Sequence, residues 1–216
     1  MIARTTKLVI CALAVLVVSG VATASASAAP EYFINGTKLA GTETISSTQV
    51  GTAKLTSTLN GSEVLIECAK GTNTGKIETG GKSTAAVKYE TCSMSKPAGC
   101  KLTAAEAKEI NTAALVDQLA GTTGAFTDEF RPASGTEFVA IAFEKCTSTL
   151  NNGSHVVSGC AAAAASEAEQ VTGTLKFQAT VSGCTLAFAG NAATITAEDD
   201  VTLSGTNKGK TFGINK

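Results

Sequence analysis

The feature that most constrains the fold of this chain is a strict alternation of side chains from Thr52 to Leu59. In "TAKLTSTL", threonine and lysine hold one set of alternate positions, while alanine, leucine and serine hold the other. A period of two residues is typical of a β-strand with one buried face. The run leads into Asn60-Gly61, which favours a tight hairpin turn because both positions accept positive φ. "SEVLIEC" then follows as the returning strand.

The same turn signal recurs at Asn35-Gly36 and Asn152-Gly153, and threonine, valine and isoleucine are plentiful. These residue types favour strands. The sequence therefore predicts an all-β fold, an antiparallel sandwich or barrel-like pair of sheets with at most one or two short helices.

Two alanine-rich segments have a more helical composition. They are "TAAEAKEINTAALVDQLAG" from Thr103 and "AAAAASEAEQ" from Ala161. Neither carries a broad stripe of large apolar residues, so we expect at most one short helix in each region. For residues 103–120 the choice between helix and strand stays open, and "NTAALVDQL" is a candidate strand.

The first 28 residues have the pattern of a secretory signal peptide. Arg4 and Lys7 precede an apolar run, and the small residues Ala26-Ser27-Ala28 offer a cleavage site. Cys11 lies early in the apolar run, which does not fit a lipid anchor. We therefore expect a signal peptide at 1–28 and a single secreted β-rich domain at 29–216.

The predicted mature chain has 15 basic and 18 acidic residues, a net charge of −3, and both signs are spread singly along it. No basic stripe points to nucleic acid or anionic lipid. No further apolar stretch is long enough to span a membrane. We expect no nucleic-acid partner and no membrane span in the mature chain.

Six cysteines remain in the mature chain, and an even count in an exported protein favours disulfides over zinc. They are Cys68, Cys92, Cys100, Cys146, Cys160 and Cys184. Cys92 and Cys146 end two similar stretches, "VKYETC" and "IAFEKC", and each is followed by a turn and another cysteine. This favours Cys92 with Cys100, Cys146 with Cys160, and Cys68 with Cys184. The rival pairing joins Cys68 to Cys92 across adjacent hairpin strands.

The stretch "GGKST" is similar to the end of a nucleotide-binding P-loop. That motif requires a glycine five positions before Gly81, where Lys76 stands. The residues after Lys82 and Ser83 are β-branched and aromatic, so they do not open a helix. We predict a Gly80-Gly81 turn between two strands and no bound nucleotide.

His155 is the only histidine and so the one candidate base for nucleophilic serine catalysis, but we predict that it is an exposed strand residue. The acids in "AEDD", Ala197 to Asp200, are suited to calcium, but a solvated turn is the favoured interpretation. The sequence therefore assigns no catalytic, cofactor-binding or metal residue, and no cofactor.

Paired carboxylates for glycoside hydrolysis are the remaining catalytic option. Glu63 with Glu67, and Glu90 with Glu144, have strand-like surroundings, but spacing alone does not select a pair. A carbohydrate-binding module usually presents exposed aromatic rings. The chain has no tryptophan and two tyrosines, and phenylalanines such as Phe143 and Phe177 fall at inward positions.

Several motifs together resemble a group of secreted proteins of unknown function from high-GC Gram-positive bacteria. They are "YFINGTKL", "LTSTLNG", "IEC", "GKIETGGKS", "YETC", "KPAGC" and "GTEFVAIAFEKC". The resemblance spans most of the mature chain and consists mainly of turns and cysteines. It implies an extracellular location and a β-rich fold, and it carries no activity or functional residue.

These observations lead to a functional expectation. We expect a secreted or cell-surface protein with a structural or binding role, non-enzymatic, whose partner is an unidentified cell-envelope or extracellular ligand. The alternative is a secreted hydrolase that acts on envelope polysaccharide through paired carboxylates.

Overall fold

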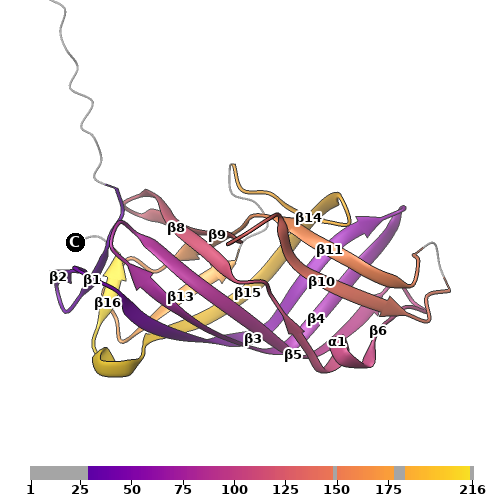
Figure 1. Cartoon of the computed structure of the whole chain (residues 1–216), viewed down its shortest axis with the longest axis horizontal. Helices are drawn as coiled ribbons and strands as arrows, with labels where there is room; N and C mark the ends of the chain where they lie inside the picture. The colour runs from indigo at the N-terminus through magenta and orange to yellow at the C-terminus, as the bar shows by residue number, and fades with distance from the viewer. Residues whose placement is uncertain (1–28, 148–149, 178–182, 215–216) are drawn as a thin grey trace, which may run out of the picture.

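The computed structural model describes residues 29–147, 150–177 and 183–214, and these residues form an elongated all-β body (Figure 1). The predicted signal peptide lies outside the described residues. Antiparallel strands dominate, as the alternation and turn signals predicted. Among the described residues, no helix is long and apolar enough to cross a membrane.

Four long strands run along the body: β3 (Glu43–Leu59), β4 (Ser62–Glu78), β5 (Lys82–Lys96) and β15 (Asn191–Leu203). The shorter strands are β1 (Tyr32–Ile34), β2 (Thr37–Lys38), β6 (Lys101–Leu102), β7 (Glu109–Asn111), β8 (Leu115–Thr122), β9 (Ala125–Pro132), β10 (Glu137–Glu144), β11 (Gly153–Gly159), β12 (Ala161–Ala165), β13 (Thr172–Phe177), β14 (Leu186–Phe188) and β16 (Phe212–Ile214). One short helix, α1 (Ala104–Lys108), and one 3₁₀ turn, η1 (Gly205–Asn207), complete the described elements.

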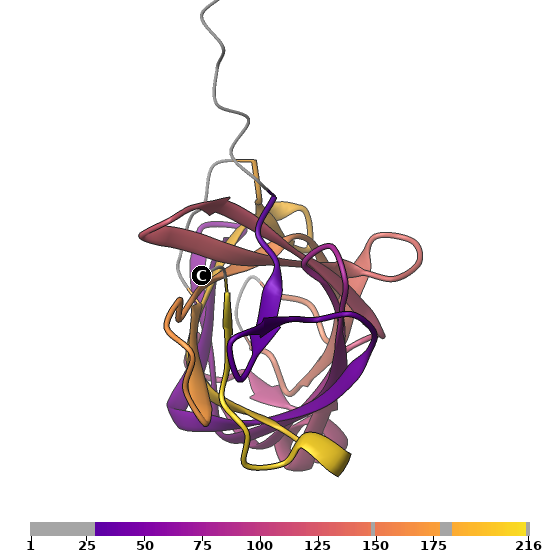
Figure 2. The same ribbon diagram turned by 90° about the vertical axis from the view of Figure 1, so that its left-hand side faces the viewer.

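Part of the large sheet closes on itself. Its strands follow the order β13-β12-β9-β8-β5-β4-β3-β15, and β13 also pairs with β15. These eight strands therefore form a closed ring, which is visible end-on in Figure 2. The ring removes the free edges that an open sheet would expose.

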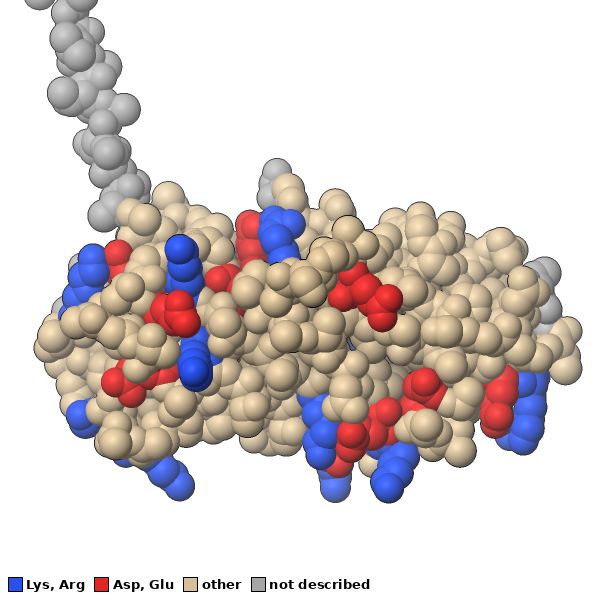
Figure 3. Space-filling view, viewed as in Figure 1, with Lys and Arg blue, Asp and Glu red and all other residues tan. Residues whose placement is uncertain are grey.

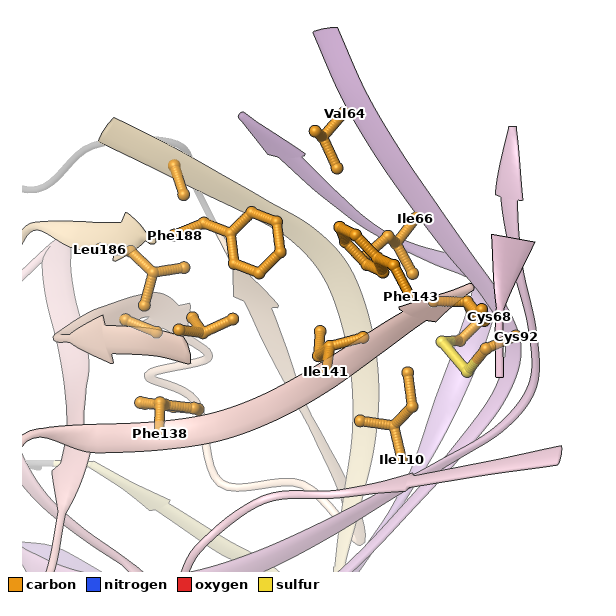
Figure 4. Close-up of a cluster of buried hydrophobic side chains, with 14 of the residues drawn as sticks. Val64, Ile66, Cys68, Cys92, Ile110, Phe138, Ile141, Phe143, Leu186 and Phe188 are labelled. Atoms are coloured by element: carbon orange, nitrogen blue, oxygen red, sulfur yellow. A yellow bond between two sulfur atoms is a disulfide. The ribbon is translucent and has the colours of Figure 1, made fainter. Parts of the chain in front are cut away.

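Beyond the ring, β14, β11, β10 and β6 continue the sheet from β15 over the other end of the long strands. Backbone bonds join this part to the opposite side, since the Ala113 amide donates to the Phe138 carbonyl at 2.8 Å. Figure 4 shows the large hydrophobic core here, with Phe143 and Phe188 fully buried between the walls. Phe177, also predicted to point inward, packs against this core from the ring.

A small sheet of β16, β1 and β2 fills the other end of the ring. It inserts Tyr32, Phe212 and Ile214 into a second hydrophobic core, in which they meet ring residues such as Ile45 and Leu119. We call this small sheet the plug. The body thus has two cores, one under the plug and one at the far end.

The predicted hairpin turns are confirmed. Asn35-Gly36 connects β1 to β2 and Asn60-Gly61 connects β3 to β4, and all four residues have positive φ. Gly80 and Gly81 also have positive φ and lie in the turn between β4 and β5. At Asn152-Gly153 the expected strands do pair, as β10 with β11, although the connection spans more residues than a tight turn.

The two alanine-rich segments form mainly strands rather than helices. Residues 104–108 are helical, but β7 and β8 follow, so the strand interpretation of "NTAALVDQL" is confirmed for most of its length. At Ala161, where we expected at most one short helix, the helical composition does not lead to a helix: Ala161–Ala165 is strand β12, paired with β9 on one side and β13 on the other. Ala161 and Ala163 face the crowded interior, where their small size matters more than their helix propensity.

All six cysteines from Cys68 onward form disulfides, but the three predicted pairs are wrong. The bonds are Cys68–Cys92, Cys100–Cys146 and Cys160–Cys184. The first joins directly opposed residues of β4 and β5, which was the rival pairing. In the second, the chain after β5 turns into β6, which pairs with β10 and so approaches Cys146. In the third, β11 pairs with β14, which brings Cys184 beside Cys160.

A pair of neighbouring glycines tests how the plug is seated. Gly80 and Gly81 both have positive φ, so alanine at either position should cost about 1 kcal/mol. An added Cβ at Gly80 meets open space, whereas at Gly81 it would lie 2.4 Å from the Pro30 carbonyl, just before β1. Gly81→Ala should therefore destabilise the protein by at least about 1 kcal/mol more than Gly80→Ala in urea unfolding. Equal costs for the two variants would contradict the seating of Pro30 on this turn.

Candidate functional site

A belt of buried polar side chains crosses the inside of the ring between the two cores. On β8, Asp117 lies between Leu115 of the large core and Leu119 of the plug-side core. On β9, Asp128 likewise lies between Phe130 and Phe126. We call the set the polar belt; its members are Ser47, Asn73, Ser83, Asp117, Asp128 and Asp199.

Asp117 and Asp128 are the charged centre of the belt. They project inward from adjacent strands in diagonal register, since Asp117 is opposite Phe130 and Asp128 is opposite Leu119. Ser83 on β5 lies directly opposite Asp117. Tyr32 reaches this point from the plug, and its hydroxyl donates to Ser83 Oγ at 3.4 Å. Four strands therefore bring two carboxyl and two hydroxyl groups to one place.

These groups line a cavity of about 40 Å³ inside the ring. Asp117 is 7% exposed and Asp128 is 4% exposed, and Oδ1 of each has no hydrogen-bond partner among the described residues. The side-chain oxygen of Asn73 accepts a bond from the Ala86 amide at 3.0 Å. Among the described residues, no lysine, arginine or histidine lines the cavity, so the two carboxyl groups have no cationic side chain of this part of the chain beside them.

Burial sets the electrostatics of this pair. It raises the pKa of Asp117 to about 7, although a hydrogen bond with Ser83 opposes the shift. Burial raises the pKa of Asp128 well above its usual range, and the neighbouring charge of Asp117 raises it further. The same surroundings raise the pKa of Tyr32, so its hydroxyl stays protonated and remains a donor. Burial and mutual repulsion therefore disfavour the state in which both carboxylates are ionised, and a nearby positive charge would favour it.

Asp199 forms a separate part of the belt on β15. Burial raises its pKa to about 6, a hydrogen bond with Ser47 opposes the shift, and the charge of Asp200 adds to it. Nearby, Gln49 anchors the bulge of β3 by donating to the carbonyls of Gly51 and Cys68, at 2.7 and 2.9 Å. Burial raises the pKa of Tyr89, and the charge of Asp199 raises it further.

The candidates that the sequence considered lie elsewhere, with one exception. Lys82 is exposed at the start of β5, whereas Ser83 is buried inside the ring. The two side chains therefore point in opposite directions and do not resemble the Lys-Ser pair of a P-loop. His155 is half-buried rather than exposed, because its ring stacks on Phe143 at a centroid distance of 4.7 Å. The exception is "AEDD", which lies within β15 and not in a solvated turn, so that Asp199 faces inward and is 9% exposed.

The four glutamates proposed for glycoside hydrolysis are on outward faces and pair with lysines. These ion pairs are Glu63–Lys96, Glu67–Lys54, Glu90–Lys88 and Glu144–Lys145. Glu63 and Glu67 are four residues apart on one strand, roughly 13 Å. Glycosidases need carboxyl groups about 5 to 9.5 Å apart. Glu63 and Glu67 are therefore too far apart to act as a catalytic pair.

One further cluster has ligand atoms close enough for a metal ion. Glu129, Cys160 and Cys184 bring their side-chain ligand atoms within 4.8 Å of one another. The two sulfurs are bonded to each other, however, and a disulfide lacks the thiolates that bind zinc. This cluster is therefore structural.

The outer surface offers a groove of about 680 Å³ across β3, β4, β5 and β8. We call it the outer groove. Its exposed lining is mainly apolar, and the side chains that line it include Ala86, Val116 and the hydroxyl-bearing Thr44, Ser46, Thr74 and Thr84. Lys76 also lines it, and among the described residues Lys76 has no ion-pair partner. Elsewhere basic and acidic side chains alternate, as the face in Figure 3 shows.

The comparisons with known proteins add no relative: no family model, no curated protein and no solved structure matches this chain. Its fold and its sites therefore rest on the geometry described above.

The sequence did contain a signal for the polar belt. In "LVDQL" and "FTDEF" the aspartate lies two residues from a large apolar residue on each side, so all three share one face of a strand. The helical composition of the first segment hid this pattern. Which aspartates meet across the ring depends on strand order, which local periodicity does not specify.

Asp199 provides a test of burial through pH. Its folded pKa of about 6 exceeds the unfolded value of about 3.9, so the folded state binds more protons between these values. Its contribution to stability is therefore full below about pH 4 and is lost as pH rises through about 6. Asp199→Asn should match the wild type near pH 4 and exceed its stability by up to roughly 3 kcal/mol at pH 8.

Urea unfolding from pH 4 to pH 8 measures this difference, with Glu137→Gln, which removes an exposed acid of β10, as the control. If the free energies of unfolding of the wild type and of Asp199→Asn changed in parallel across this pH range, Asp199 would be hydrated in the folded protein.

Proposed function

We propose that this is an exported binding protein of the cell surface or extracellular space, without enzymatic activity. The outer groove is the observation that carries the proposal, because its volume falls in the range of ligand sites in proteins. Three disulfides among the described residues are consistent with an oxidising, extracellular setting.

The chemistry of the groove suggests its ligand. The groove presents mainly apolar surface, and the hydroxyl groups of Thr44, Thr74 and Thr84 add donors and acceptors for a hydroxyl-bearing partner. Lys76 supplies one positive charge that no described acid compensates. The proposed ligand is therefore a hydroxyl-rich envelope polymer that carries anionic groups.

The absence of enzymatic activity is supported by where the carboxyl groups lie. The outward glutamates are held by lysines, and the inward pair of Asp117 and Asp128 faces a cavity of about 40 Å³. That volume admits water or an ion and is smaller than a sugar ring. The small size of this cavity and the wide spacing of Glu63 and Glu67 along β4 support a binding role over the hydrolase alternative.

Exchanging one lysine tests the groove. Lys76→Glu should weaken cosedimentation with purified Gram-positive cell-wall polymer by about tenfold or more, because a repulsive charge replaces an attractive one in the groove. Lys70→Glu is the matched control, since Lys70 is also an exposed lysine of β4 but does not line the groove.

The proposed site would be contradicted if the wild type did not cosediment with the polymer, or if both variants lost polymer binding equally. Release of reducing sugar during the same incubation would favour the hydrolase instead.

A further inference from the structure

We propose that Asp117 and Asp128 form the centre of an internal site for a hard divalent cation of the calcium class, with Ser83 and Tyr32 as further oxygen ligands. This inference concerns the inside of the ring and is independent of the outer groove.

The first argument is charge. Two buried aspartates share a cavity whose lining, within residues 29–147, 150–177 and 183–214, contains no lysine, arginine or histidine. An unpaired charge taken out of water is strongly destabilising, and two like charges are worse. One divalent cation between the two carboxylates cancels their charge.

The second argument is the pair of free ligand atoms. Oδ1 of Asp117 and Oδ1 of Asp128 have no hydrogen-bond partner among the described residues, and both side chains are more than nine-tenths buried. Buried polar atoms normally have a partner, so each such atom requires an explanation. Both atoms belong to residues that line the same cavity, where a cation would bind them together.

The third argument is ligand chemistry. The hydroxyl groups beside the aspartates contribute oxygen: the Ser83 hydroxyl is opposite Asp117, and the Tyr32 hydroxyl lies 3.4 Å from Ser83 Oγ. Asn73 also lines the cavity, but its side-chain oxygen already accepts the Ala86 amide, so it is not counted as a ligand. Carboxylate and hydroxyl oxygens select hard cations over zinc or copper. Calcium accepts irregular arrangements of six to eight oxygens, whereas magnesium requires a near-ideal octahedron. Ligands from four different strands fit calcium better.

The fourth argument is size. A cavity holds a water molecule when the volume that water-sized spheres can occupy in it exceeds about 10 to 15 Å³. The cavity here is about 40 Å³, which leaves room for one cation with one or two waters that complete its coordination. Such an ion would link β8, β9 and β5 of the ring to Tyr32 of the plug.

Terbium luminescence tests the site directly, because terbium replaces calcium and is excited by energy transfer from a nearby tyrosine. The chain has no tryptophan and only two tyrosines, Tyr32 and Tyr89. After chelator treatment, the wild type incubated with terbium should emit, and excess calcium should quench the emission. Tyr32→Phe should lose most of the signal, whereas Tyr89→Phe should keep it.

Carboxamide variants identify the ligands. Asp128→Asn keeps the shape of the side chain and should weaken terbium binding by about tenfold or more, as should Asp117→Asn. Asp199→Asn is the matched control, because Asp199 is a buried aspartate of the same belt that does not line this cavity. It should bind terbium as the wild type does.

Thermal melting gives a second measurement that does not depend on the variants. At pH 8, millimolar calcium should raise the melting temperature of the wild type by several degrees relative to chelator, because a ligand that binds only the folded state stabilises it. The proposal is overturned if terbium emission is absent, survives Tyr32→Phe, or is unchanged in Asp128→Asn. It is also overturned if calcium leaves the melting temperature at pH 8 unchanged, which would mean that protons alone neutralise the pair.

Discussion

Backbone pairing between β13 and β15 is the contact on which the rest of the structure depends. It extends over six residue pairs, from Thr172 opposite Thr202 to Phe177 opposite Ala197, and it converts an open sheet into a ring. An open sheet of this length would leave unpaired edges and a hydrated inner face. Closure removes both, and it places every inward side chain of eight strands in one enclosed interior.

Closure also explains why the polar belt is unusual. Inward positions of a closed ring are normally filled by apolar side chains, and here the two cores are separated by three aspartates, two serines and an asparagine. Carboxyl groups in such a place destabilise the fold unless a proton or a cation neutralises them. Because the closed walls bury these carboxyl groups, the belt couples the stability of the ring to the charge state of its centre.

Local patterns in the sequence were sufficient for much of this architecture. Alternation and the Asn-Gly and Gly-Gly dipeptides predicted the strands and turns around β3, β4 and β5, because these depend on neighbouring residues alone. The disulfides were predicted wrongly because Cys100 and Cys160 find their partners through the pairing of β6 with β10 and of β11 with β14, which are non-local contacts. The polar belt was missed for the same reason, since only strand order shows that Asp117 and Asp128 share one interior. The strand at Ala161 was missed because its pairing with β9 is also a non-local contact.

The most direct test of this account is amide hydrogen exchange within β13, followed residue by residue by NMR. Leu175, Lys176 and Phe177 pair with β12 on one side and β15 on the other, so the account predicts strong and similar protection of all three amides. If β13 were the edge of an open sheet, an amide directed away from β12 would be exposed to solvent. Fast exchange at one of these positions beside slow exchange at its neighbours would contradict the closed ring.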